Sequence, residues 1–151
     1  MKKIKTFALA CGVLLLAFNT SFAQPEATRF IESQFSGCDY EVSHLNQFLG
    51  HLQNQFELRG YIIVYAGREG SRVNTALAYG ERMKKYLATS RDFDKERVTV
   101  IDGGFREKLS YELWLASPVA ESPKPKPTVA KERIKLREGR TKLRRCDKIQ
   151  G

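Results

Sequence analysis

The sequence predicts a small α/β (α+β) domain that carries a basic C-terminal arm. Three observations lead to this prediction. Apolar residues recur at helical spacing in two segments, continuous or alternating apolar runs indicate three strands, and a proline-rich stretch precedes a tail rich in Lys and Arg. The expected order is helix, strand, helix, strand, strand, with the helices packed on a three-stranded sheet.

The first expected helix follows Ser43, which can cap its N-terminus. Gly60 lies just past its end, as is common after helices. Residues 61–66 are continuously apolar and rich in β-branched side chains, which is typical of a strand covered on both faces. The apolar residues at helical spacing are Leu45, Phe48, Leu49, Leu52 and Phe56.

The second expected helix covers about 73–89, and the second strand 98–101. Asp102-Gly103-Gly104 is a turn signal, and alternating apolar residues over 109–115 indicate the third strand. A strand, a crossover helix and a strand form a parallel right-handed unit, so the first two strands should be parallel. The third strand should pair antiparallel with the second because their connection is short. Expected inward residues of the helix are Leu77, Met83 and Leu87.

Residues 1–23 have the features of a secretory signal peptide. Three lysines precede an apolar run over 7–18, and Ser21-Phe22-Ala23 places small residues at the cleavage positions. The run is shorter than the roughly 20 residues that a spanning helix needs. We therefore expect a secreted or periplasmic protein without a transmembrane segment after cleavage, and Cys11 would be lost with the signal.

Charge divides the remaining chain into a near-neutral globular domain, 24–117, and a basic tail. The domain carries twelve basic and thirteen acidic residues, whereas 118–151 carries eleven basic and four acidic ones. Four prolines favour an extended linker over 118–128. In the arm, 129–151, the alternation around Ile134 and Leu136 indicates a short strand.

The number of cysteines predicts a covalent link between the arm and the domain. Cys38 and Cys146 are the two cysteines left after signal removal, and export would place them in an oxidising compartment. We expect a disulfide between them, in preference to free or intermolecular thiols. Closing a loop of roughly 100 residues would stabilise the fold by nominally about 4–5 kcal/mol.

A candidate ligand site follows from the predicted topology. Loops that leave two parallel strands emerge at one edge of the sheet, where open α/β sheets tend to bind ligands. The arginines could grip a carboxylate or phosphate, the acids could receive an ammonium, and the start of the second helix favours an anion. The alternative is that these are solvated loop charges that pair with one another. The residues expected to meet there are Arg68, Glu69, Ser71, Arg72, Asp102, Phe105, Arg106 and Glu107.

Other functions receive less support. His44 and His51 have no metal-ligand spacing with Cys38 or Asp39, so no metal or cofactor is expected. The arm has no aromatic residue for base stacking, so nucleic acid is not an expected partner. The alternative to a non-catalytic role is a small secreted hydrolase that uses Asp102 as a base.

The order of elements resembles the OmpA-like peptidoglycan-binding domain. The residues that carry this resemblance are 60–67, the Met83–Leu87 end of the second helix and 94–104. It implies an envelope protein that holds the peptide stem of peptidoglycan through an aspartate after the first strand and a helix arginine. Here Arg68-Glu69-Gly70 follows the strand, and Arg82 lies about one turn from the position of that arginine.

The whole chain, including the linker and the last cysteine, is more similar to short secreted bacterial proteins of unassigned function. The expected function is therefore that of an exported, non-catalytic binding or structural protein of the cell envelope. Its expected partner is peptidoglycan or another anionic or zwitterionic envelope polymer.

Overall fold

The structure, a computed structural model, describes residues 25–89, 93–143 and 146. The predicted signal peptide lies outside these residues. The expected α/β class is confirmed, although the sheet has four strands instead of three. The elements are β1 (Thr28–Gln34), α1 (Cys38–Asn54), β2 (Arg59–Gly67), α2 (Thr75–Thr89), η1 (Lys95–Arg97), β3 (Val98–Arg106), β4 (Ser110–Ala116) and η2 (Lys131–Arg133).

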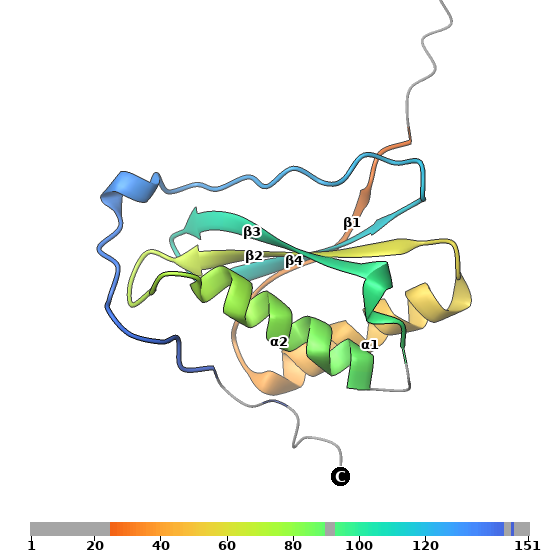
Figure 1. Ribbon diagram of the computed structural model, residues 1–151, viewed down its shortest axis with the longest axis horizontal. Helices are drawn as coiled ribbons and strands as arrows, with labels where there is room; N and C mark the ends of the chain where they lie inside the picture. The colour runs from red at the N-terminus through yellow and green to blue at the C-terminus, as the bar shows by residue number, and fades with distance from the viewer. Residues whose placement is uncertain (1–24, 90–92, 144–145, 147–151) are drawn as a thin grey trace, which may run out of the picture.

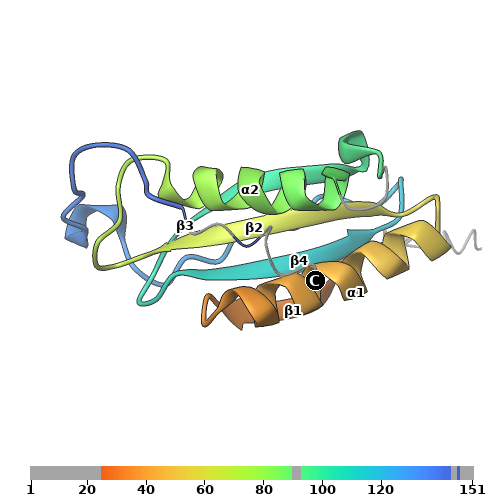
Figure 2. The same ribbon diagram turned by 90° about the horizontal axis from the view of Figure 1, so that it is seen from below.

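The molecule has two main layers and a strap. Helices α1 and α2 cover one face of the sheet, and the chain after β4 runs across the opposite face (Figure 1). Seen from the helix side, the two helices lie next to each other over the strands (Figure 2). The arm then passes the end of the sheet where β2 and β3 finish (Figure 1).

The strand order is β1-β4-β2-β3. The parallel pairing of β2 with β3 is confirmed. The expectation that β4 pairs with β3 is wrong, because β4 pairs antiparallel with β2 on one side and β1 on the other. The short connection from β3 therefore crosses the end of β2, where Gly67 has no side chain and a Cβ would lie 3.0 Å from the Leu109 nitrogen.

The core lies between the helices and the inner face of the sheet. Met83 and Leu87 of α2 are buried as expected, but Leu77 is 37% exposed. Helix α1 begins at Cys38, earlier than expected, and ends before Phe56, which is 78% exposed. The central buried side chains are Leu45, Phe48, Leu52, Ile62, Val64, Met83, Leu87, Tyr111 and Leu113.

Strand β3 continues through Asp102-Gly103-Gly104, so the predicted turn there is wrong. The register with β2 shifts at this point, as in a β-bulge. Gly103 permits the irregularity because a Cβ there would lie 2.6 Å from the Tyr65 ring. The bulge lets the strand run on to Arg106.

The arm is fixed to the domain without forming the predicted strand. Val129 is buried and pairs with the backbone of Phe105, and the amide of Arg137 donates to the carbonyl oxygen of Ser71 at 2.9 Å. The segment around Ile134 and Leu136 follows the short helix η2 and has no regular strand partner. No helix in the described ranges is long and apolar enough to span a bilayer.

Candidate functional site

The candidate site is a hollow at the ends of β2 and β3. Its volume is about 700 Å³. The loop after β2, the β3–β4 turn, the first turns of α2 and the arm together form its walls. The lining residues are Gly67, Arg68, Glu69, Gly70, Ser71, Arg72, Thr75, Tyr79, Glu107, Lys108, Leu109, Thr141 and Lys142. We call this hollow the strand-end pocket.

Ser71 shapes the loop that forms the pocket floor. Its side chain is almost fully buried, and its hydroxyl donates to the carbonyl oxygen of Gly67 at 2.6 Å. Its own carbonyl oxygen accepts the amide of Arg137 from the arm. Ser71 therefore holds the loop in shape, and its role in ligand binding stays a prediction.

Arg68 and the β3–β4 turn close one side of the pocket. Its guanidinium contacts the carboxylate of Glu107 at 3.3 Å, and both side chains are largely exposed. Such an exposed ion pair is worth little by itself, so a ligand could displace it at small cost. Glu69 lies exposed on the same rim.

Arg72 and Thr75 join the start of α2 to the arm. The Nε of Arg72 donates to the carbonyl oxygen of Glu138 at 3.0 Å, and its backbone amide donates to the Thr75 hydroxyl at 2.8 Å. The hydroxyls of Thr75 and Thr141 lie 3.1 Å apart. The arm is thus a wall of the pocket that specific contacts hold in place.

Asp102 and Arg106 do not line the strand-end pocket. The exposed carboxylate of Asp102 accepts the amide of Gly104 at 2.9 Å within the bulge. It borders a separate hollow of about 520 Å³, together with Phe105 and residues of the linker and arm. Arg106 points to the opposite face of the sheet, so the predicted cluster of three arginines is not formed.

Sequence reasoning missed the contribution of Lys108, Thr141 and Lys142. Lys108 could have been found from its place in the connection after β3. The two arm residues have no local signal, because their position depends on how the disulfide and the loop contacts guide the arm. With them, the pocket carries four cations and two acids, Glu69 and Glu107, among its lining residues, which favours an anion. The cations are Arg68, Arg72, Lys108 and Lys142.

A buried polar network occupies the sheet face opposite the helices. The carboxylate of Glu112 is 2% exposed and binds Arg106 at 2.6 Å. It also accepts hydrogen bonds from the hydroxyl of Tyr65 at 3.2 Å and the indole of Trp114 at 2.9 Å. Arg106 in turn contacts Glu32 at 2.7 Å. Every charge of this network has an opposite partner, as burial requires.

The network is also protected from the solvent by the linker. The guanidinium of Arg106 stacks 3.5 Å from the centre of the Tyr65 ring, and the amide of Lys126 donates to the Tyr65 hydroxyl. Burial raises the pKa of Tyr65. Burial lowers the pKa of Arg106, but its contacts with Glu112, Tyr65 and Glu32 outweigh this and raise it overall. Glu32 and Arg106 border a hollow of about 480 Å³, but the buried Glu112 does not line it, and we assign the network to stability because its charges are paired with one another.

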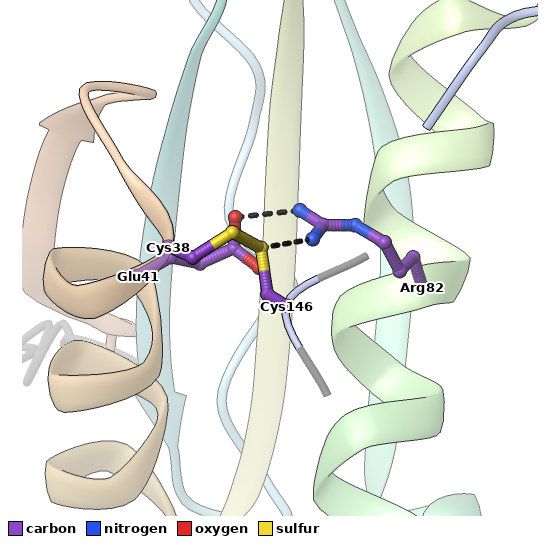
Figure 3. Close-up of a disulfide and its surroundings, with 4 residues drawn as sticks. All are labelled: Cys38, Glu41, Arg82 and Cys146. Carbon is purple, nitrogen blue, oxygen red and sulfur yellow. Dashed lines mark hydrogen bonds and ion pairs between the residues drawn. A yellow bond between two sulfur atoms is a disulfide. The ribbon is translucent and has the colours of Figure 1, made fainter. Parts of the chain in front are cut away.

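The predicted disulfide joins Cys38 at the start of α1 to Cys146 in the arm, with Cα atoms 5.2 Å apart. Arg82 of α2 reaches across to it and donates to Cys146 Sγ at 2.8 Å and to the carboxylate of Glu41 (Figure 3). Burial raises the pKa of Glu41, and the charge of Arg82 opposes this shift. The disulfide, α1 and α2 are thereby connected at one point.

The two histidines take part in packing. His44 Nδ1 lies 2.7 Å from the Tyr111 hydroxyl, and His51 contacts Phe30 edge-on. Burial raises the pKa of Tyr111 to about 12. Within the part of the chain that the structure describes, no group of His, Cys, Asp and Glu could hold a metal ion.

Comparison with known proteins gives no assignment. No family model matches the chain, and no curated protein matches it either. A functional interpretation therefore depends on the geometry and charge of the pocket.

Proposed function

We propose that this chain is an exported, non-catalytic binding protein of the cell envelope, and that the strand-end pocket takes an anionic or zwitterionic ligand. The observation that supports this is a hollow of about 700 Å³ with Arg68, Arg72, Lys108 and Lys142 on its walls. The pocket is polar, charged and built from loops on a rigid sheet, which is a common arrangement for binding.

The pocket offers both signs of charge. Lys108 and Lys142 have no carboxylate partner among the described residues, so they are available for a carboxylate or phosphate. Glu69 lies on the same rim and could receive an ammonium group. A peptide that carries free carboxylates and an amine fits this pattern, and the peptide stem of peptidoglycan is such a ligand. The OmpA-like resemblance supports the same candidate.

Two features support the proposed location. The first 23 residues have the pattern of a secretory signal, and the Cys38–Cys146 disulfide suits an oxidising compartment such as the periplasm or the exterior. The disulfide also attaches the arm that carries Thr141 and Lys142. In an exported protein the disulfide would form and hold these two arm residues in the pocket wall.

The test is co-sedimentation of the purified, oxidised protein with insoluble peptidoglycan. The test variant is Arg68→Ala with Lys108→Ala, because both side chains line the pocket and neither is buried. The control is Arg59→Ala with Lys85→Ala, which removes the same charge from exposed positions elsewhere.

The proposal predicts that wild type and control sediment with the polymer at moderate salt and that the test variant stays in solution. Equal retention of the two variants would refute the pocket as the binding site. Loss of wild-type retention at moderate salt would show nonspecific charge attraction instead, because such contacts are screened.

A further inference from the structure

The arm exposes a regular row of cations. Arg133, Lys135 and Arg137 are exposed, whereas Ile134 and Leu136 between them are half-buried. Leu136 lines the hollow next to the start of α2. The apolar side chains of the alternation are thus partly covered, whereas the three cations stay accessible to solvent; Lys135 and Arg137 also border a hollow of about 530 Å³ with Arg68 and Glu69 of the domain. We call Arg133, Lys135 and Arg137 the arm ridge.

The backbone under the arm ridge is held on both sides. Before it, the amide of Val129 donates to the carbonyl oxygen of Phe105 at 3.1 Å. At its end, the amide of Arg137 donates to Ser71, and the next carbonyl, that of Glu138, accepts from Arg72. Farther on, the disulfide fixes the arm to α1. Such anchoring lowers the entropy cost of binding compared with a free tail.

The three cations are not neutralised by the domain. Within the described ranges none of Arg133, Lys135 and Arg137 forms an ion pair. Over 131–142 the chain carries six basic residues and only two acidic ones. The arm ridge is therefore a local concentration of positive charge that is available to a partner.

The geometry of the ridge selects among anionic partners. Arg133 is the last residue of η2 and Ile134 after it is extended, so the backbone positions of Arg133 and Lys135 lie about 6.6 Å apart. A polymer with one phosphate in each extended repeat presents charges in a similar single row. Arginine also matches phosphate oxygens through paired hydrogen bonds. A lipid bilayer is less suited, because the ridge exposes no aromatic or apolar side chain that could enter it.

We infer that the arm ridge is a docking surface for a linear phosphodiester polymer of the cell envelope, with a polyol-phosphate backbone. The choice of an envelope polymer over nucleic acid depends on the proposed export. The arm ridge adjoins the strand-end pocket, because Lys135 and Arg137 share a hollow with Arg68 and Glu69, but Lys108 lies outside that hollow. The protein would then contact the envelope at two places.

The test measures binding of fluorescein-labelled poly(glycerol phosphate) by anisotropy over a series of salt concentrations. The test variant carries Arg133→Ala, Lys135→Ala and Arg137→Ala. The control carries Arg59→Ala, Lys85→Ala and Lys95→Ala, three exposed cations far from the arm in sequence. All six positions are on the surface, and unchanged thermal unfolding of both variants verifies that they fold.

The inference predicts at least about tenfold weaker binding at low salt for the arm variant. Its slope of log K against log salt should fall by about 2, since each phosphate contact on a flexible single chain contributes about 0.7. The control should keep the wild-type slope. Equal losses in the two variants, or no loss in either, would overturn the inference.

Further measurements distinguish an envelope polymer from other partners that carry phosphate. Single-stranded DNA of equal length that binds as tightly, with the same dependence on the arm ridge, would overturn the envelope assignment. Arm-dependent binding to anionic phospholipid vesicles with none to the polymer would replace it with a membrane surface. The Lys108→Ala variant, which changes the strand-end pocket but not the hollow beside the arm ridge, should bind the polymer like wild type, so failure of the pocket proposal would be seen separately.

Discussion

Removal of the disulfide should lower the free energy of unfolding by about 5 kcal/mol. The bond joins residues 108 positions apart. For a loop of this length, the loss of chain entropy in the unfolded state corresponds to about 4.8 kcal/mol at 25 °C. For a domain of this size, that difference corresponds to a fall in Tm of about 15–20 °C.

The perturbation is the double variant Cys38→Ala with Cys146→Ala, and the assay is urea unfolding followed by far-UV circular dichroism. Reduced wild type should unfold at nearly the same urea concentration as the variant. Hydrogen exchange at the amide of Arg137, which donates to Ser71 across the arm contact, should also become faster. A loss below about 1 kcal/mol would refute the reasoning, because the unfolded chain would then gain little freedom.

Three other predictions concern the domain. Glu112→Ala should destabilise it by about 1–3 kcal/mol, seen by urea unfolding, because the Tyr65 hydroxyl and the Trp114 indole lose their acceptor while Arg106 keeps Glu32. Gly80→Ala should lower the free energy of unfolding by about 1–3 kcal/mol, because the added Cβ would overlap β3. Gly50→Ala in α1 should stabilise the domain, because its Cβ would meet nothing within 4 Å. Equal Tm values for the two variants would contradict this reasoning. Burial raises the pKa of Glu41 above 4.5, so the folded state binds this proton more tightly than the unfolded state does. Stability should therefore fall as pH rises through the raised pKa. Glu41→Gln should make Tm depend less on pH between pH 4 and 8.

The sequence was informative wherever local periodicity decided the structure. Met83 and Leu87 follow the helical period and are buried, and 61–66 is a buried strand as expected. Cys38 and Cys146 were predictable because only one pairing remained once the signal was set aside. These features depend on the spacing of apolar residues along the chain or on the number of cysteines.

The missed elements depend on contacts between distant segments. Strand β1 has adjacent apolar residues, Phe30 and Ile31, and a register shift against β4, so it lacks the alternation typical of a strand. Glu112 alternates with apolar residues as a solvent-facing acid would, yet the linker covers it. Gly67 marks the point where the β3–β4 connection crosses β2, but a lone glycine does not reveal what passes over it.

The candidate site was predictable in part for the same reason. Arg68, Glu69, Arg72 and Glu107 lie at one pocket because they follow the ends of two parallel strands. Arg106 lies on the other face because the bulge in β3 and the buried partner Glu112 direct it there. Such a placement cannot be derived from the strand ends alone.

The most direct test of the central claim is a titration of the isotope-labelled, oxidised protein with the free peptide stem of peptidoglycan, followed by two-dimensional NMR. The account predicts saturable chemical-shift changes at the amides of Ser71 and Lys108. In the Arg68→Ala, Lys108→Ala variant, the change at Ser71 should disappear. An absence of shifts, or shifts confined to the arm ridge, would contradict the strand-end pocket as the ligand site.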